Sequence, residues 1–146
     1  MTVLGIDPGR NGGCAWIRDG RPCAEKLPES PYDLATILRG IIREESLGMV
    51  YAYVEKVSSS PQMGVVSAFT FGRGIGMIEG VLATLEIPVT FVRPQQWQKA
   101  LGCLTKGDKN VSKLKTQQLF PALKITHAIA DSLLIAEYGR RDLHTL

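Results

Sequence analysis

Three carboxylates occupy positions from which acids can gather around a cation. Asp7 and Glu55 each directly follow a short apolar run, and Asp131 lies inside an apolar stretch with helical spacing. An acid that follows a β-strand is presented at the edge of the sheet, and a helical acid can approach that edge from the side. Carboxylate oxygens are the ligands that hard divalent cations such as Mg²⁺ prefer. Because two such ions about 3.5–4 Å apart can stabilise the attacking and leaving oxygens of a phosphodiester, the sequence predicts a metal site suited to nuclease chemistry.

Composition narrows the class of protein. A chain of 146 residues with 45% hydrophobic content has the size of a single domain, which we expect to span residues 1–146. The odd number of cysteines and the lack of C-x-x-C spacing favour neither a disulfide framework nor a zinc site, and fit a reducing compartment. We see no signal peptide and expect no membrane-spanning stretch, so we predict a cytoplasmic protein without a membrane partner.

Charge is distributed unevenly along the chain. The formal net charge is only +3, but residues 93–124 carry seven basic residues against one acidic residue, Asp108. The remainder carries ten basic and thirteen acidic residues. A basic zone beside an acidic metal site suits a polyanion whose backbone is held by lysines. The alternative is an ordinary solvated helix face.

Hydrophobic patterning predicts a sheet that begins with antiparallel strands. Residues 2–6, 13–17 and 21–25 have the pattern of three short strands, and Asp19-Gly20 is a hairpin signal between the last two. An amphipathic helix over 34–42 and an apolar strand over 49–55 follow. Such a strand-helix-strand unit predicts a right-handed parallel crossover.

A long apolar helix is predicted from about residue 64 to residue 85, with Gly72, Gly76 and Gly80 at four-residue spacing. Each glycine costs about 1 kcal/mol of helix stability relative to alanine, so three on one face need a packing reason. We predict close approach of this face to the sheet; the alternative is contact with a helix of a second subunit. A strand over 89–92 and helices over 95–101, 108–120 and 127–138 complete the predicted elements.

Three acidic segments together resemble a known family. Gly5-Ile6-Asp7-Pro8-Gly9, Val54-Glu55-Lys56-Val57 and Ala130-Asp131-Ser132-Leu133-Leu134-Ile135-Ala136 are similar to the acidic motifs of the RuvC family of Holliday junction resolvases, particularly its compact phage-type members. The resemblance implies an α/β, RNase H-like fold: a mixed central sheet with an antiparallel three-strand start and flanking helices. Sugar kinases and actin-like ATPases share the first motif, but they need two such domains, so we expect no nucleotide cofactor.

The resemblance implies a metal-dependent, structure-selective DNA endonuclease. Such an enzyme resolves four-way junctions by paired symmetric nicks, as a homodimer, in the cytoplasm of a bacterium or phage-infected host. Asp7 would bind both of two Mg²⁺ or Mn²⁺ ions, Glu55 the ion that activates water, and Asp131 the other. The alternatives are an RNase H-like nuclease acting on other branched or hybrid nucleic acid, and a catalytically impaired junction-binding protein.

Residues around these acids are candidates for DNA contact. The segment after Glu55 reaches the branch point of the junction in the family, and the basic zone would follow phosphates beside the site. The candidate DNA-binding residues are Lys56, Gln62, Met63, Arg73, Lys106, Lys109, Lys113 and Lys115.

The last motif departs from the family pattern at Ala128. Family members usually carry an acid or histidine three residues before the helical aspartate, where this chain has alanine. His127 precedes Asp131 by four residues, about 40° from eclipsed on a helix, so it shares a face with Asp131. His127 is therefore a candidate ligand or general acid, with a structural role as its alternative. A further alternative is that a carboxylate has been replaced by Ala128, which predicts junction binding with little cleavage.

Overall fold

A five-stranded mixed sheet forms the centre of the molecule in this computed structural model, which describes residues 1–46 and 48–146. The strand order is β3-β2-β1-β4-β5. β1 pairs antiparallel with β2, and β2 with β3, whereas β1, β4 and β5 run parallel. This arrangement confirms the predicted mixed sheet with an antiparallel start. The strands are β1 (Thr2–Ile6), β2 (Gly13–Arg18), β3 (Arg21–Lys26), β4 (Val50–Glu55) and β5 (Val89–Val92).

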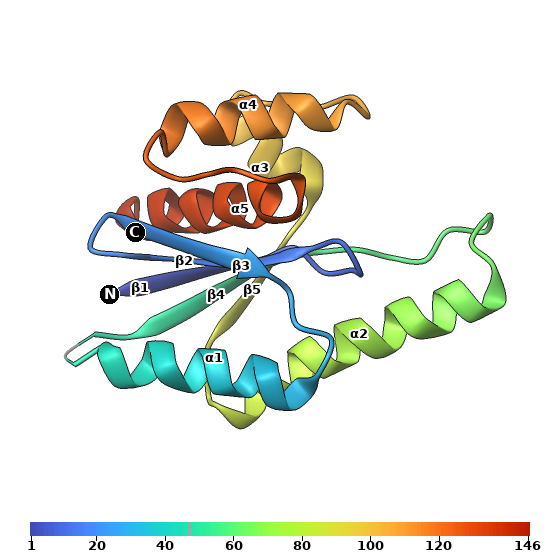
Figure 1. Cartoon of the computed structure of the whole chain (residues 1–146), viewed down its shortest axis with the longest axis horizontal. Coiled ribbons are helices and arrows are strands. Elements are labelled where there is room, and N and C mark those ends of the chain that lie inside the picture. The colour runs from blue at the N-terminus through green and yellow to red at the C-terminus, as the bar shows by residue number, and fades with distance from the viewer. Residues whose placement is uncertain (47) are drawn as a thin grey trace.

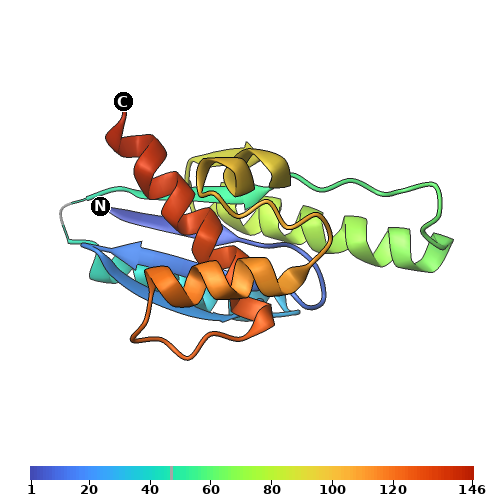
Figure 2. The ribbon, with the colours of Figure 1, turned by 90° about the horizontal axis from the view of Figure 1, so that it is seen from above.

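Helices cover both faces of this sheet (Figures 1 and 2). On one face lie α1 (Pro31–Glu44), which the Ser30 side chain caps through the Tyr32 backbone N–H, and α2 (Val65–Thr84). On the other lie α3 (Pro94–Ala100), α4 (Lys109–Leu119) and α5 (His127–His144). The helices were all predicted, but α5 extends six residues beyond the predicted end at Tyr138. Apolar side chains fill the space between the sheet and each helical layer.

The close approach of α5 to the sheet depends on two glycines. A Cβ atom on Gly5 of β1 would collide with the backbone of Ser132 and Ala136, and a Cβ on Gly13 of β2 would lie 2.5 Å from the carbonyl oxygen of Ala128. Real Cβ atoms do not approach backbone this closely, so any larger residue forces α5 away from the strands. The early strands and the last helix are thereby brought into direct backbone contact.

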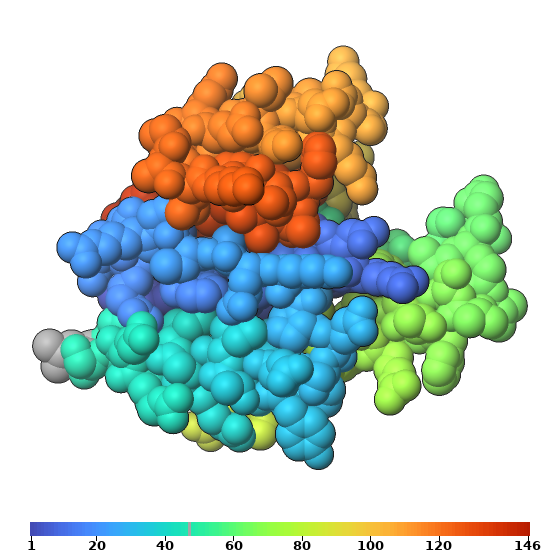
Figure 3. Space-filling view, viewed as in Figure 1, coloured from blue at the N-terminus to red at the C-terminus, as the bar shows by residue number. Residues whose placement is uncertain are grey.

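The observed surroundings of α2 differ from the predicted ones. Among the residues that the structure describes, Cβ atoms on Gly72, Gly76 and Gly80 would meet nothing within 4 Å, so the prediction that this face packs on the sheet is wrong. The only buried residues of α2 are Ile78 and Leu82. The first half of α2 and the loop before it project from the body (Figures 1 and 3).

The apolar composition of α2 has a second consequence. By length and composition alone, α2 would be long enough and apolar enough to cross a membrane. No membrane-spanning stretch was expected from the sequence, and the length and composition of α2 alone do not decide against that expectation. One such helix is weak evidence, and α2 also carries Arg73 and Glu79.

Replacing Gly5 by alanine should separate α5 from β1. We expect Gly5→Ala to lower the free energy of unfolding by about 3 kcal/mol, because overpacking against backbone cannot be relieved by a rotamer change. The matched control is Gly40→Ala in α1, where a Cβ meets nothing within 4 Å. That variant should gain up to about 1 kcal/mol from helix propensity. Urea unfolding curves measure both; a Gly5→Ala variant as stable as the parent would contradict this account of α5.

Candidate metal centre

Asp7 lies at the carboxyl end of β1, in the middle of the sheet. Its backbone N–H donates to the carbonyl oxygen of Gly13 at 3.0 Å, which fixes the chain as it leaves the strand. The pKa of Asp7 is raised to about 8, first by burial and then by the negative charges of Glu55 and Asp131, while Lys109 partly offsets the rise. Asp7 is therefore surrounded by groups of its own charge.

Glu55 is the last residue of β4, the parallel neighbour of β1. Because Ile6 pairs with Val54, the residues that follow, Asp7 and Glu55, emerge at the same level of the sheet. The indole N–H of Trp97 donates to Oε2 of Glu55 at 2.8 Å. Burial raises the pKa of Glu55, and the charge of Asp131 adds to the rise, whereas the Trp97 hydrogen bond lowers it. Trp97 thus orients this carboxylate and favours its charged form.

Asp131 reaches the same edge from α5. Burial raises its pKa, while a hydrogen bond with Ser112 and the positive charges of Lys109 and His127 lower it. Ser112 belongs to α4, which packs on α5 and is joined to it where the Thr116 hydroxyl lies 3.2 Å from the Ala130 carbonyl oxygen. Two helices therefore set the position of this third acid.

These three acids form an electrostatically coupled group that suits a cation. They come from β1, β4 and α5, and each has a raised pKa with burial as the first cause. Oxygen donors in a partly dehydrated, like-charged group fit Mg²⁺ or Mn²⁺ by charge and by ligand type. Across residues 1–46 and 48–146, however, no three His, Cys, Asp or Glu side chains are close enough to form a ready ligand set. The carboxylates are neighbours but do not converge on one point.

The predicted DNA-binding residues lie in two regions. Lys109 opens α4 beside the acids, and its charge lowers the pKa of both Asp7 and Asp131. Lys106 is exposed in the preceding loop, with a left-handed backbone (φ 47°). Lys113 and Lys115 are half-buried. The charge of Lys115 lowers the pKa of Cys103 and not that of the three acids. The second region, next to Glu55 and along the projecting loop and α2, holds the exposed Lys56, Gln62 and Arg73 and the half-buried Met63.

The start of α5 holds the two residues of the atypical motif. His127 is the first residue of α5 and is exposed, and its charge lowers the pKa of Asp131. Ala128 is half-buried over Gly13. His127 therefore lies near the acids without being buried by packing, and the predicted ligand or acid role remains a prediction.

Sequence reasoning missed Ser112 as a partner of Asp131 and gave no role to Trp97. Trp97 lies in α3, a segment that the sequence predicted only as a helix. A serine on a basic amphipathic helix carries no signal of its own. Its role follows from the packing of α4 on α5.

Comparison with solved structures identifies the architecture. No protein-family model and no curated protein matches the sequence itself. The structure of Thermus thermophilus RuvC superposes with a TM-score of 0.67 and 19% sequence identity, over 99% of this chain and 96% of that one. This chain has the RuvC fold. The T. thermophilus RuvC structure in complex with a Holliday junction substrate matches with the same values. The predicted RNase H-like fold class is thereby confirmed, at an identity that supports the fold alone.

Neutralising Asp7 should stabilise the metal-free protein at alkaline pH. An acid whose pKa rises on folding holds a proton in the folded state, so its contribution to stability is lost as pH rises from about 4 to about 8. We expect Asp7→Asn to exceed the parent in melting temperature at pH 8 in EDTA, with a smaller difference at pH 5. The control is Glu29→Gln, which removes one negative charge at an exposed position away from the three acids and should leave the melting temperature close to that of the parent.

Added Mg²⁺ should make the parent melt at a higher temperature than Asp7→Asn, because an ion that binds only the folded state stabilises the folded protein. The parent should gain more than Asp7→Asn at pH 8. Equal gains in the two proteins would argue against Asp7 as a ligand.

Proposed function

We propose that this chain is a divalent-metal-dependent endonuclease selective for four-way DNA junctions, with cleavage weakened at Ala128. The observation that carries the proposal is the group of Asp7, Glu55 and Asp131 at one edge of a RuvC-fold sheet, with Lys109 beside it. One structure of this fold holds a Holliday junction substrate, which supports branched DNA as the partner.

The chain's own residues prepare the site for a phosphodiester. Asp7, Glu55 and Asp131 would hold two Mg²⁺ or Mn²⁺ ions, which supply an acidified water and offset charge on the leaving oxygen when bound. Trp97 leaves Oε1 of Glu55 free to act as a ligand while it holds Oε2. Lys109 adds positive charge where the phosphate would arrive, so it favours the approach of an anion to an acidic site.

DNA outside the site would meet both basic regions. Lys106, Lys109 and Lys113 lie along the loop before α4 and its first turns, where they can follow successive phosphates. The projecting loop and α2, with Gln62, Met63 and Arg73, extend away from the sheet (Figure 2) and suit contact with a second arm of the junction.

A homodimer fits the open face of α2. Besides its unobstructed glycines, this helix exposes apolar side chains, including Val65 at 86% and Phe69 at 73%. Contiguous exposed apolar surface is typical of interaction sites. A substrate with two equivalent strands to cut calls for two equivalent active sites, and a two-fold dimer supplies them.

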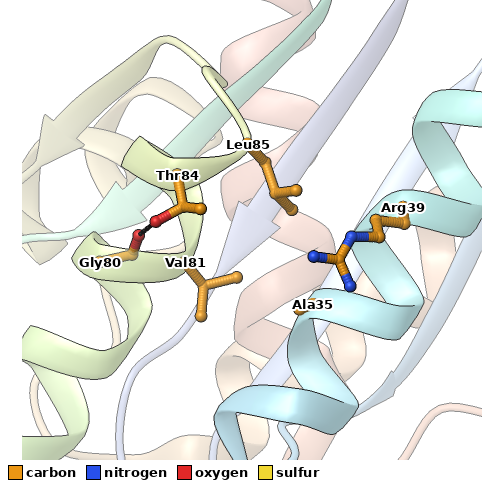
Figure 4. Close-up of a pocket in the computed structure, with 6 residues that line it drawn as sticks. All are labelled: Ala35, Arg39, Gly80, Val81, Thr84 and Leu85. Atoms are coloured by element: carbon orange, nitrogen blue, oxygen red, sulfur yellow. Dashed lines mark hydrogen bonds between the residues drawn. The ribbon is translucent and has the colours of Figure 1, made fainter.

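The proposed dimer contact also involves the groove beside the end of α2. A cavity of about 130 Å³ lies between α1 and the end of α2, where Arg39 extends its guanidinium from α1 toward Val81 and Leu85 (Figure 4). Phe69 precedes Gly76 by seven residues, and Leu85 follows it by nine. Two antiparallel α2 helices crossing at Gly76 would therefore bring Phe69 of each copy to the level of the other's cavity. Arg39 there offers a cation to the aromatic ring.

Obstructing the crossing should separate the dimer. We expect Gly76→Leu to sediment as a monomer while remaining folded, because a Cβ at this position would meet nothing within 4 Å among the described residues. Gly40→Leu makes the same change in α1, also in open space, and should leave the dimer intact. A Gly76→Leu variant that stays dimeric would remove α2 from the interface. A monomeric parent that pellets with lipid vesicles would assign the face to a membrane instead.

Ala128 is the decisive position for activity. The parent should bind a synthetic four-way junction more tightly than linear duplex and show little Mg²⁺-dependent nicking. Ala128→Asp should raise nicking by orders of magnitude through recovered metal binding, and adding Asp7→Asn to it should abolish the gain. Vigorous cleavage by the parent that is lost on His127→Ala would assign the missing role to the histidine. Equal binding of junction and duplex by the parent and by Ala128→Asp would contradict the proposed substrate.

A further inference from the structure

The loop between β1 and β2 is short and closed on itself. The backbone N–H of Asp7 donates to the Gly13 carbonyl oxygen at 3.0 Å, and the N–H of Gly12 donates to the Gly9 carbonyl oxygen at 3.1 Å. The N–H of Leu27 donates to the Gly12 carbonyl oxygen at 3.0 Å. A Cβ atom on Gly12 would collide with the Asp7 carbonyl oxygen, so the two ends of the loop are in backbone contact. The loop therefore has one shape, and its position follows that of Asp7.

Arg10 lies at the tip of this loop, three residues after Asp7. Its side chain is exposed, and in the described part of the chain its guanidinium forms no ion pair. The neighbouring acids and Lys109 shift the pKa of Asp7, and Arg10 is not among the causes of that shift. The guanidinium is thus not one of the groups that surround the acids, and it is available to an anion outside the metal site.

The same loop adjoins α2. A Cβ atom on Gly9 would lie 3.9 Å from the Phe71 ring, and the loop after β1 reaches from the end of the sheet toward α2 (Figure 3). One turn further along α2, Ile75 lines a cavity of about 200 Å³ together with Glu55 and Phe91. The tip of the loop therefore lies where the surface passes from the acids to α2.

This place is the boundary between the two candidate DNA-binding regions. Lys109 stands beside the acids on α4, whereas the second region follows Glu55 and continues along α2 to Arg73. We propose that Arg10 binds the phosphate at which the DNA strand passing the acids crosses from one arm of the junction to the next. A guanidinium suits this contact because two of its N–H groups can donate in parallel to two phosphate oxygens.

A contact at this point selects branched DNA. The phosphates of exchanging strands crowd together at a crossover, so a cation placed there offsets a repulsion that a linear duplex does not have. A duplex can follow α4 without turning toward α2, which leaves Arg10 without a phosphate. Arg10 is therefore a specificity-determining residue. The inference rests on the proposed junction function and names a residue that gives the site its selectivity.

The first test compares junction and linear duplex binding by Arg10→Gln, with Ca²⁺ in place of Mg²⁺ so that binding is measured without cleavage. Loss of one charge-assisted contact should weaken junction binding about tenfold and lower the slope of log K against log salt by about 0.9. Duplex binding should change less than about twofold, because a duplex leaves Arg10 unused. Arg10→Lys, which keeps the charge without the fork, should recover only part of the junction affinity.

The control is Arg21→Gln, which removes the same charge from an exposed arginine at the other end of the sheet. Arg21 pairs with Arg18, which pairs with Thr2 at the start of β1, whereas Arg10 follows the end of that strand. Arg21→Gln should bind both DNAs as the parent does.

A second measurement locates the contact on the DNA. Single phosphates around the crossover are replaced, one at a time, by neutral methylphosphonates. One replacement should weaken binding by the parent but not by Arg10→Gln, because both changes remove the same interaction. Additive losses at every phosphate, or equal losses of junction and duplex affinity, would overturn the inference while sparing the proposed function. An Arg10→Gln variant that sediments as a monomer would also overturn it, by assigning Arg10 to the subunit contact. Failure of the parent to select junctions over duplex would remove both.

Discussion

The backbone contact between α5 and the first two strands positions the rest of the candidate site. Gly5 and Gly13 leave no room for a side chain, so α5 lies directly on β1 and β2. This approach brings Asp131 to the strand end that presents Asp7, and it also provides the surface on which α4 packs. Because α4 carries Ser112 and Lys109, the helical part of the site depends on the same contact.

The site concentrates like charge at a cost in stability. Burial raises the pKa values of all three acids, and the charges of neighbouring acids add to the rise at Asp7 and Glu55; Lys109 offsets only part of the rise at Asp7 and Asp131. By contrast, Glu137 on the same helix is paired with Arg140 and Arg141, which lower its pKa. The fold thus neutralises an acid by pairing where its role is structural, and leaves the acids of the candidate site available to a cation.

Local sequence patterns predicted the fold well because they report local physics. Alternating and continuous apolar runs gave the five strands, and the Asp19-Gly20 turn has the positive φ values that its hairpin requires (48° and 77°). The positions of Asp7 and Glu55 at strand ends followed from the same patterns. The α2 glycines show the limit: their spacing indicates an unusual face, but not what covers it. Ser112 shows a second limit of local patterns, because its hydrogen bond with Asp131 depends on how α4 and α5 pack together.

The alternation of side chains at the end of β4 separates two kinds of surface. Glu55 is held by Trp97 on one face, while neighbouring positions open toward α2 on the other. Substitutions at Phe91 or along α2 therefore alter a surface that, within residues 1–46 and 48–146, shares no side-chain hydrogen bond with the three acids. Such an arrangement allows recognition to diversify while the chemistry stays constant. It also makes the α2 side of the sheet the natural place to redesign selectivity in this protein.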